Sequence, residues 1–115
     1  MAHPRRFRFW HQRLDVFRVA IRFVHFVESI EPRWFRGSSG RRAQLANAAD
    51  SIALNIAEGS SQTSPRARQN HHRIALGSAG ECDALLEILG ARGCPVDQGR
   101  ELLCRLGAML CRMTE

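Results

Sequence analysis

The sequence predicts an all-α protein, an antiparallel up-and-down four-helix bundle, on three observations. The 115 residues suffice for one domain, spanning 1–115. Aromatic residues make up only 7% of the chain and Tyr is absent, so aliphatic residues dominate the apolar set, which suits helices better than sheets. Apolar residues also recur three and four positions apart, in segments separated by Pro and Gly.

The first helix is expected over residues 9–30, after a basic tail, 1–8. Its polar residues fall within a sector of roughly 80° at 100° per residue, namely Asp15, Arg18, Arg22, His25 and Ser29. A helix packed only within its own bundle needs an apolar stripe somewhat over ~100° wide, and this stripe is about twice as wide. The excess predicts a second buried face, and hence self-association.

The other three helices are expected over residues 41–57, 65–92 and 96–113. Pro32 ends the first helix, because the residue before a proline is disfavoured in the α region. Gly59 is the expected stop of the second helix, and Ser64-Pro65 supplies an N-cap and a first helical residue for the third. The connections are short, so consecutive helices are expected to be antiparallel.

Positive charge is concentrated in the first third of the chain. Residues 1–42 hold ten Arg and three acidic residues, a net charge of +7, whereas residues 43–115 have a net charge of −1. All seventeen basic residues are Arg, whose forked side chain matches phosphate.

Several classes of protein are disfavoured. Arginines and Glu28 interrupt the most hydrophobic stretch, so we expect no membrane span. The first residues contain no apolar region, so we expect no secretory leader. The four cysteines form no C-x-x-C pair and indicate reduced, packed thiols in a cytoplasmic protein, without a metal or another cofactor; they are Cys82, Cys94, Cys104 and Cys111.

Two motifs at the junction of the second and third helices carry a family resemblance. The segment 51–60, SIALNIAEGS, and the segment 73–78, RIALGS, followed by Glu81, resemble the bacterial four-helix bundle proteins encoded in 23S ribosomal RNA intervening sequences. This resemblance implies a ring, usually a homopentamer. It also implies kinship with the accessory variability determinants of diversity-generating retroelements, which act with a reverse transcriptase and nucleic acid.

The chain departs from the family pattern at several positions. Ala53 stands where Pro is common, and Ala46-Asn47 replaces an expected Arg pair. Four polar residues occupy positions that are usually apolar, namely Asp50, Arg68, His71 and His72.

The structural motif of the family comprises Gly59 and five polar residues, Asn55, Glu58, Arg73, Ser78 and Glu81. The polar residues have two interpretations. In the structural interpretation, which we favour, Asn55 and Glu58 close the second helix while Arg73 pairs with Glu58 or Glu81. In the alternative, the same residues form a ligand or catalytic cluster.

The basic residues are candidates for phosphate neutralisation. The predicted nucleic-acid-binding residues are Arg18, Arg22, Arg33, Arg36, Arg41 and Arg42, with Arg5, Arg6 and Arg8 in the tail. Trp34 and Phe35 either stack on unpaired bases or plug the end of the bundle. Solvated arginines without a ligand are the alternative for the charge.

These patterns lead to one main functional hypothesis and two alternatives. The main hypothesis is a non-enzymatic, oligomeric protein that binds RNA or DNA as a ribonucleoprotein accessory. The first alternative is a scaffold that binds protein only. The remote alternative is a ribonuclease of the HEPN type, because Arg66 and His71 have the Arg-x4-His spacing; Arg6 and His11 share this spacing, so it discriminates little.

Overall fold

The computed structural model describes residues 7–114, apart from the side chain of Ser39, and within this range the chain forms helices and no strand. The α-helices are α1 (Asp15–Ser29), α2 (Ser39–Ser60), α3 (Pro65–Ala91) and α4 (Asp97–Met113). Two short 3-10 helices, η1 (Trp10–Arg13) and η2 (Pro32–Phe35), precede α1 and α2. The prediction of an all-α fold with four helices is confirmed. The tail residues Arg5 and Arg6 lie outside the described range.

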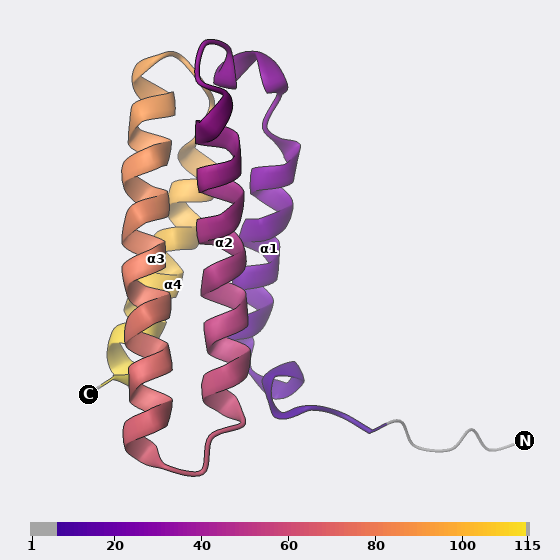
Figure 1. The fold of residues 1–115 in the computed structure, drawn as a ribbon, viewed down its shortest axis with the longest axis vertical. Coiled ribbons are helices and arrows are strands. Elements are labelled where there is room, and N and C mark those ends of the chain that lie inside the picture. The colour runs from indigo at the N-terminus through magenta and orange to yellow at the C-terminus, as the bar shows by residue number, and fades with distance from the viewer. Residues whose placement is uncertain (1–6, 115) are drawn as a thin grey trace, which may run out of the picture.

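The four α-helices lie side by side along the long axis of the molecule (Figure 1). α1 and α3 each contact both α2 and α4. The segment with η2 and the connection from α3 to α4 lie at one end of the molecule, which we call the η2 end. The connection from α2 to α3 lies at the other end with η1, and we call it the η1 end (Figure 1).

The core draws large buried side chains from every α-helix. Those that are almost fully buried are Phe23, Leu45, Ile52, Ile56, Leu86, Leu89, Leu106 and Leu110. Removal of this apolar surface from water is the main force that holds the helices together. None of the described helices is both long enough and apolar enough to cross a membrane.

The wide apolar arc of α1 is only partly buried within one chain. Val19, Ala20 and Phe23 lie in the core, whereas Phe17 and Ile21 on the flank of the helix are half-buried against it. Full burial of this flank requires another surface, so self-association stays a prediction.

The predicted start of the first helix, at residue 9, is wrong. Residues 10–13 form η1 instead, because the Gln12 side chain accepts a hydrogen bond at 2.7 Å from the Phe9 main-chain N–H and closes a tight turn. Leu14 is extended, with φ −94° and ψ 126°, so the chain changes direction before α1 begins. Asp15 then lies in the first turn of α1, where a carboxylate interacts favourably with the helix dipole.

The prediction that Gly59 stops the second helix is also wrong, because α2 continues to Ser60. Gly59 is buried inside the helix, and a Cβ atom on it would lie 3.1 Å from the Cβ atom of His71 and 3.1 Å from two ring atoms of His72. The glycine therefore allows α3 to approach α2 closely. The helix also starts earlier than residue 41, directly after the turn at Gly37, whose φ is 80°.

The third helix begins at Pro65, with Ser64 as its N-cap. The Ser64 hydroxyl accepts a hydrogen bond at 3.3 Å from the Ala67 main-chain N–H, as an N-cap does. After α3 ends, Gly93 has a φ of 99°, in the left-handed region that favours glycine. The chain then enters α4 at Asp97.

Two of the four cysteines are buried and two are exposed. Cys82 and Cys94 are buried, as expected of packed thiols, and all four cysteines are free. Cys104 and Cys111 are exposed on α4, so the expectation of burial is wrong for them.

Candidate nucleic-acid interface

Four of the predicted arginines lie around η2 and the start of α2. These η2-end arginines are Arg33, Arg36, Arg41 and Arg42. Within the described residues, Arg36 and Arg42 are exposed and make no ion pair, so both charges are available to a ligand. Arg33 instead donates from Nε to Glu31 Oε2 at 2.8 Å, and its guanidinium lies 4.6 Å from the centroid of the Trp34 ring. Arg41 is half-buried, and its Nη1 atom is buried without a hydrogen-bond partner.

The structure does not join Arg18 to the η2-end arginines. Arg18 lies in the first half of α1, toward the η1 end, where it donates to Asp15 Oδ1 at 2.7 Å and to the Gln12 carbonyl oxygen at 3.3 Å. Arg22 is exposed in a groove between α1 and α4, which also contains Arg105 and one carboxylate, that of Glu101. The predicted arginines thus form one group at the η2 end and two separate positions along α1.

The aromatic pair near these arginines packs against the protein. Phe35 is buried in the core, and Trp34 is half-buried close to Gly93. This burial favours the interpretation in which the two rings plug the end of the bundle, and it leaves neither ring as an open stacking surface.

The polar residues of the family motif form a network between α2 and α3. His71 Nδ1 lies 3.1 Å from Asn55 Oδ1, and the Asn55 amide donates to the Ser51 carbonyl oxygen at 2.9 Å. The hydroxyls of Ser51 and Ser78 are 2.8 Å apart. Polar side chains of α2 and α3 thereby form hydrogen bonds with one another, which is what the structural interpretation requires.

The expected ion pair of Arg73 is wrong. Arg73 is exposed and makes no ion pair among residues 7–114, because it lies on the side of α3 away from α2. Glu58 instead approaches His71 at 3.5 Å, and Glu81 accepts a hydrogen bond from Gln44 at 3.4 Å. The sequence suggested the correct helix pair but the wrong partner.

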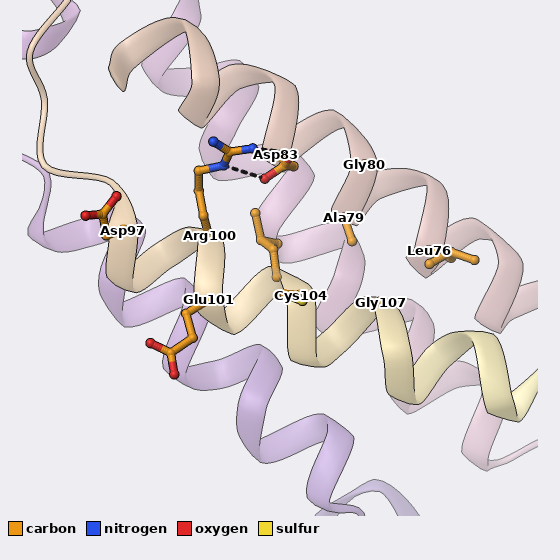
Figure 2. A pocket seen from close by; sticks show the side chains of 10 residues that line it. Leu76, Ala79, Gly80, Asp83, Asp97, Arg100, Glu101, Cys104 and Gly107 are labelled. Carbon is orange, nitrogen blue, oxygen red and sulfur yellow. Dashed lines mark hydrogen bonds and ion pairs between the residues drawn. The ribbon is translucent and has the colours of Figure 1, made fainter. Parts of the chain in front are cut away.

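A groove of about 610 Å³ lies between α3 and α4, and Figure 2 shows its lining. Arg100 makes two hydrogen bonds to Asp83, at 3.0 and 3.3 Å, so its charge is already neutralised. This ion pair raises the pKa of Arg100 above its ordinary value. Asp97 and Glu101 add two more carboxylates. An excess of negative charge makes this groove unsuitable for a phosphate backbone.

The spacing of Arg66 and His71 does not assemble a paired site. Five positions along an α-helix correspond to a rotation of about 140° around its axis, and His71 Nδ1 is engaged with Asn55. Arg66 is exposed and makes no ion pair among residues 7–114.

A second basic region was not predicted from the sequence. A pocket of about 720 Å³ lies at the η1 end, and we call it the end pocket; it is lined by Trp10, Arg13, Leu14, Ser60, Ser61, Gln62, Thr63, Arg68, His72 and Met113. His72 is buried with neither ring nitrogen in a hydrogen bond. Burial lowers the pKa of His72, and the charges of Arg68 and His71 lower it further, against an opposing effect of the nearby Met113 carbonyl. The only signal in the sequence was the unusual polarity of Arg68, His71 and His72.

The fold and these surfaces define a basic all-α four-helix protein whose motif residues join α2 to α3. The chain belongs to the 23S rRNA-intervening sequence protein family, which matches residues 12–112. This match confirms the resemblance seen in the two motifs. A comparison with curated proteins finds no match.

Proposed function

We propose that this protein is a non-enzymatic, RNA-binding accessory protein. The observation that carries the proposal is the pair of exposed arginines at the η2 end, Arg36 and Arg42, which no carboxylate among the described residues neutralises. They lie beside Arg33 and Arg41 in the third of the chain that holds a net charge of +7. The family description, which refers to ribosomal RNA, supports RNA as the polyanion.

Binding of this kind depends on the release of counterions from the phosphate backbone, and it therefore weakens steeply as salt rises. Each arginine that contacts a phosphate contributes about one unit to the slope of log affinity against log salt concentration. Ion-paired arginines contribute less, because binding RNA would first require breaking the existing pair. We therefore expect Arg36 and Arg42 to matter more than Arg18 and Arg33.

The test compares two double variants that remove the same charge. Arg36→Gln with Arg42→Gln should weaken binding to a mixed RNA and reduce the salt slope by about two units. Arg66→Gln with Arg73→Gln, at exposed positions of α3, should leave the slope nearly unchanged. The readout is fluorescence anisotropy of labelled RNA at several salt concentrations. Equal effects of the two double variants, or no retention of RNA at low salt, would refute the proposal and leave the protein-binding scaffold.

We further propose that the chain forms an antiparallel up-and-down bundle that assembles into a homo-oligomeric ring. The half-buried flank of α1, Phe17, Ile21 and Val24, supports this, since it gains full burial only against another surface. Light scattering should give a molar mass that is a multiple of 13.0 kDa, and the charged substitution Ile21→Glu should reduce it. A monomer at all concentrations would contradict assembly. The family resemblance also implies a reverse transcriptase as a partner. Copurification of the two proteins tests this partner separately from assembly.

A further inference from the structure

The end pocket combines segments that are far apart in the sequence. η1 contributes Trp10 and Arg13, the α2–α3 connection contributes hydroxyl and amide groups, and Met113 comes from the last turn of α4. Its volume of about 720 Å³ lies in the range of pockets that hold small organic ligands. No acidic residue is among the described residues that line it. The pocket therefore suits an anionic ligand with an apolar part.

His72 forms part of the wall of this pocket. The residue is only 3% exposed, and both of its ring nitrogens are shielded from solvent. Its Nε2 atom faces Gly59 of α2, and the Met113 main chain lies close to the ring. His72 therefore shapes the pocket, and the groups that can reach a ligand belong to the more exposed residues around it.

Two arginines give the pocket its positive charge. Arg13 and Arg68 are exposed and make no ion pair among the described residues. Arg68 makes one long hydrogen bond, at 3.5 Å, to the Thr63 carbonyl oxygen. The forked guanidinium groups of both residues are thus open to a phosphate, which they match in geometry.

Trp10 provides an aromatic surface beside these charges. The residue is 64% exposed, and the Arg13 guanidinium lies 5.1 Å from the centroid of its ring. Exposed tryptophans next to arginines are typical of surfaces on which unpaired bases stack. Leu14 and Met113 add apolar contacts.

We propose that the end pocket binds an unpaired nucleotide, with Arg13 and Arg68 on the phosphate and Trp10 stacked on the base. The ligand is either a free nucleoside monophosphate or one nucleotide of a single strand, which share this chemistry. The inference goes beyond the proposed function, because a mononucleotide can bind here even if the η2-end arginines bind nothing.

The experiment uses Trp34→Phe protein, in which Trp10 is the only tryptophan. Adenosine monophosphate should quench Trp10 fluorescence and saturate, whereas adenosine or inorganic phosphate alone should bind at least about tenfold more weakly. In this background, Arg68→Gln should weaken binding about tenfold. Arg66→Gln removes the same charge two positions away, outside the pocket, and should leave binding unchanged.

Arg13→Gln separates binding from folding. Arg13 is exposed and makes no ion pair among the described residues, so this variant should unfold at about the same temperature as the wild type, yet bind the nucleotide about tenfold more weakly. Equal binding by wild type and Arg13→Gln would overturn the role of Arg13. Absence of saturable quenching by both adenosine monophosphate and a single-stranded tetranucleotide would overturn the whole proposal.

Two further binding measurements identify the source of the ligand and keep this inference separate from the proposed function. Tighter binding of the tetranucleotide than of the mononucleotide would assign the pocket to a strand, and the reverse order to free nucleotide; both support the pocket. Arg36→Gln with Arg42→Gln should leave mononucleotide binding unchanged. Loss of mononucleotide binding in that variant would overturn the independence of the two sites.

Discussion

Gly59 of α2 lies directly against the imidazole ring of His72 on α3: a Cβ atom on the glycine would be 3.1 Å from both Cδ2 and Nε2 of that ring. It would also lie 3.1 Å from the Cβ atom of His71, which cannot move without the α3 backbone. The closest approach of the two helices in this region therefore depends on the missing side chain.

The first prediction concerns this contact. Gly59→Ala gains about 1 kcal/mol of helix propensity but forces α3 outward, at a cost of about 1–3 kcal/mol for overpacking. We expect net destabilisation of about 1 kcal/mol by urea denaturation. Gly80→Ala is the control, because nothing lies within 4 Å of its added Cβ atom, and it should stabilise the protein by about 0.5–1 kcal/mol. If both substitutions stabilised the protein, α3 would be able to move away from α2 at little cost in free energy.

The second prediction tests whether the motif hydroxyls act together. Ser51 and Ser78 share a 2.8 Å hydrogen bond, and Ser51 Oγ also accepts from the Asn55 amide at 3.2 Å. Each single Ser→Ala change should cost about 1 kcal/mol, with Ser51→Ala the larger, because each leaves a partner unsatisfied. The double variant should cost less than the sum by about 0.5–1.5 kcal/mol. Simple additivity of the unfolding free energies would contradict the direct bond.

The third prediction is a pH dependence of stability. The pKa of His72 is lowered from 6.5, first by burial and then by the charges of Arg68 and His71. Below about pH 6.5 the unfolded state therefore binds a proton that the folded state does not. Stability should fall as pH decreases through this window, by at most about 1.4 kcal/mol per pH unit from this group.

His72→Leu isolates that effect. The difference between its unfolding free energy and that of the wild type should grow as pH falls from about 7 to about 5, since the leucine binds no proton. Parallel profiles for the two proteins would mean that His72 titrates normally in the folded state.

The fourth prediction concerns thiol reactivity. Burial, together with the charge of Glu81, raises the pKa of Cys82 to about 12 from 9.0, which lowers its thiolate fraction about 1,000-fold. Burial also raises the pKa of Cys94. Iodoacetamide should therefore modify exposed Cys104 and Cys111 first, as mapped by mass spectrometry, and all four thiols after denaturation. Early modification of Cys82 would contradict its place in the core.

Local chemistry made most helix limits predictable. The start of α1 was missed because Gln12 and Phe9 close a local turn, whereas the end of α2 depends on a contact with another helix. Ser64 and Pro65 act within one turn of chain, so the start of α3 could be read from the sequence. The role of Gly59 could not be read from the sequence, because glycine is common both at helix ends and at positions where two helices approach closely. The choice between these roles depended on the two histidines that α3 presents to it.

The same distinction applies to the candidate sites. The arginines of the η2 end lie within ten positions of one another, so their grouping followed from a short loop. The pairing of Arg73 depended instead on the rotation of α3 about its axis, which places His71 and not Arg73 against α2. The end pocket could not be predicted at all, since Trp10, Arg68 and Met113 meet only in the folded chain.

The end pocket is completed late, because its residues come from both ends of the described chain. During synthesis, η1 and the α2–α3 connection emerge well before Met113, so the end pocket stays open on one side until the last turn of α4 packs. Only the fully folded chain offers the complete pocket. Any ligand that binds there favours the finished fold over its partly folded precursors, and so also protects the newly made chain against proteolysis.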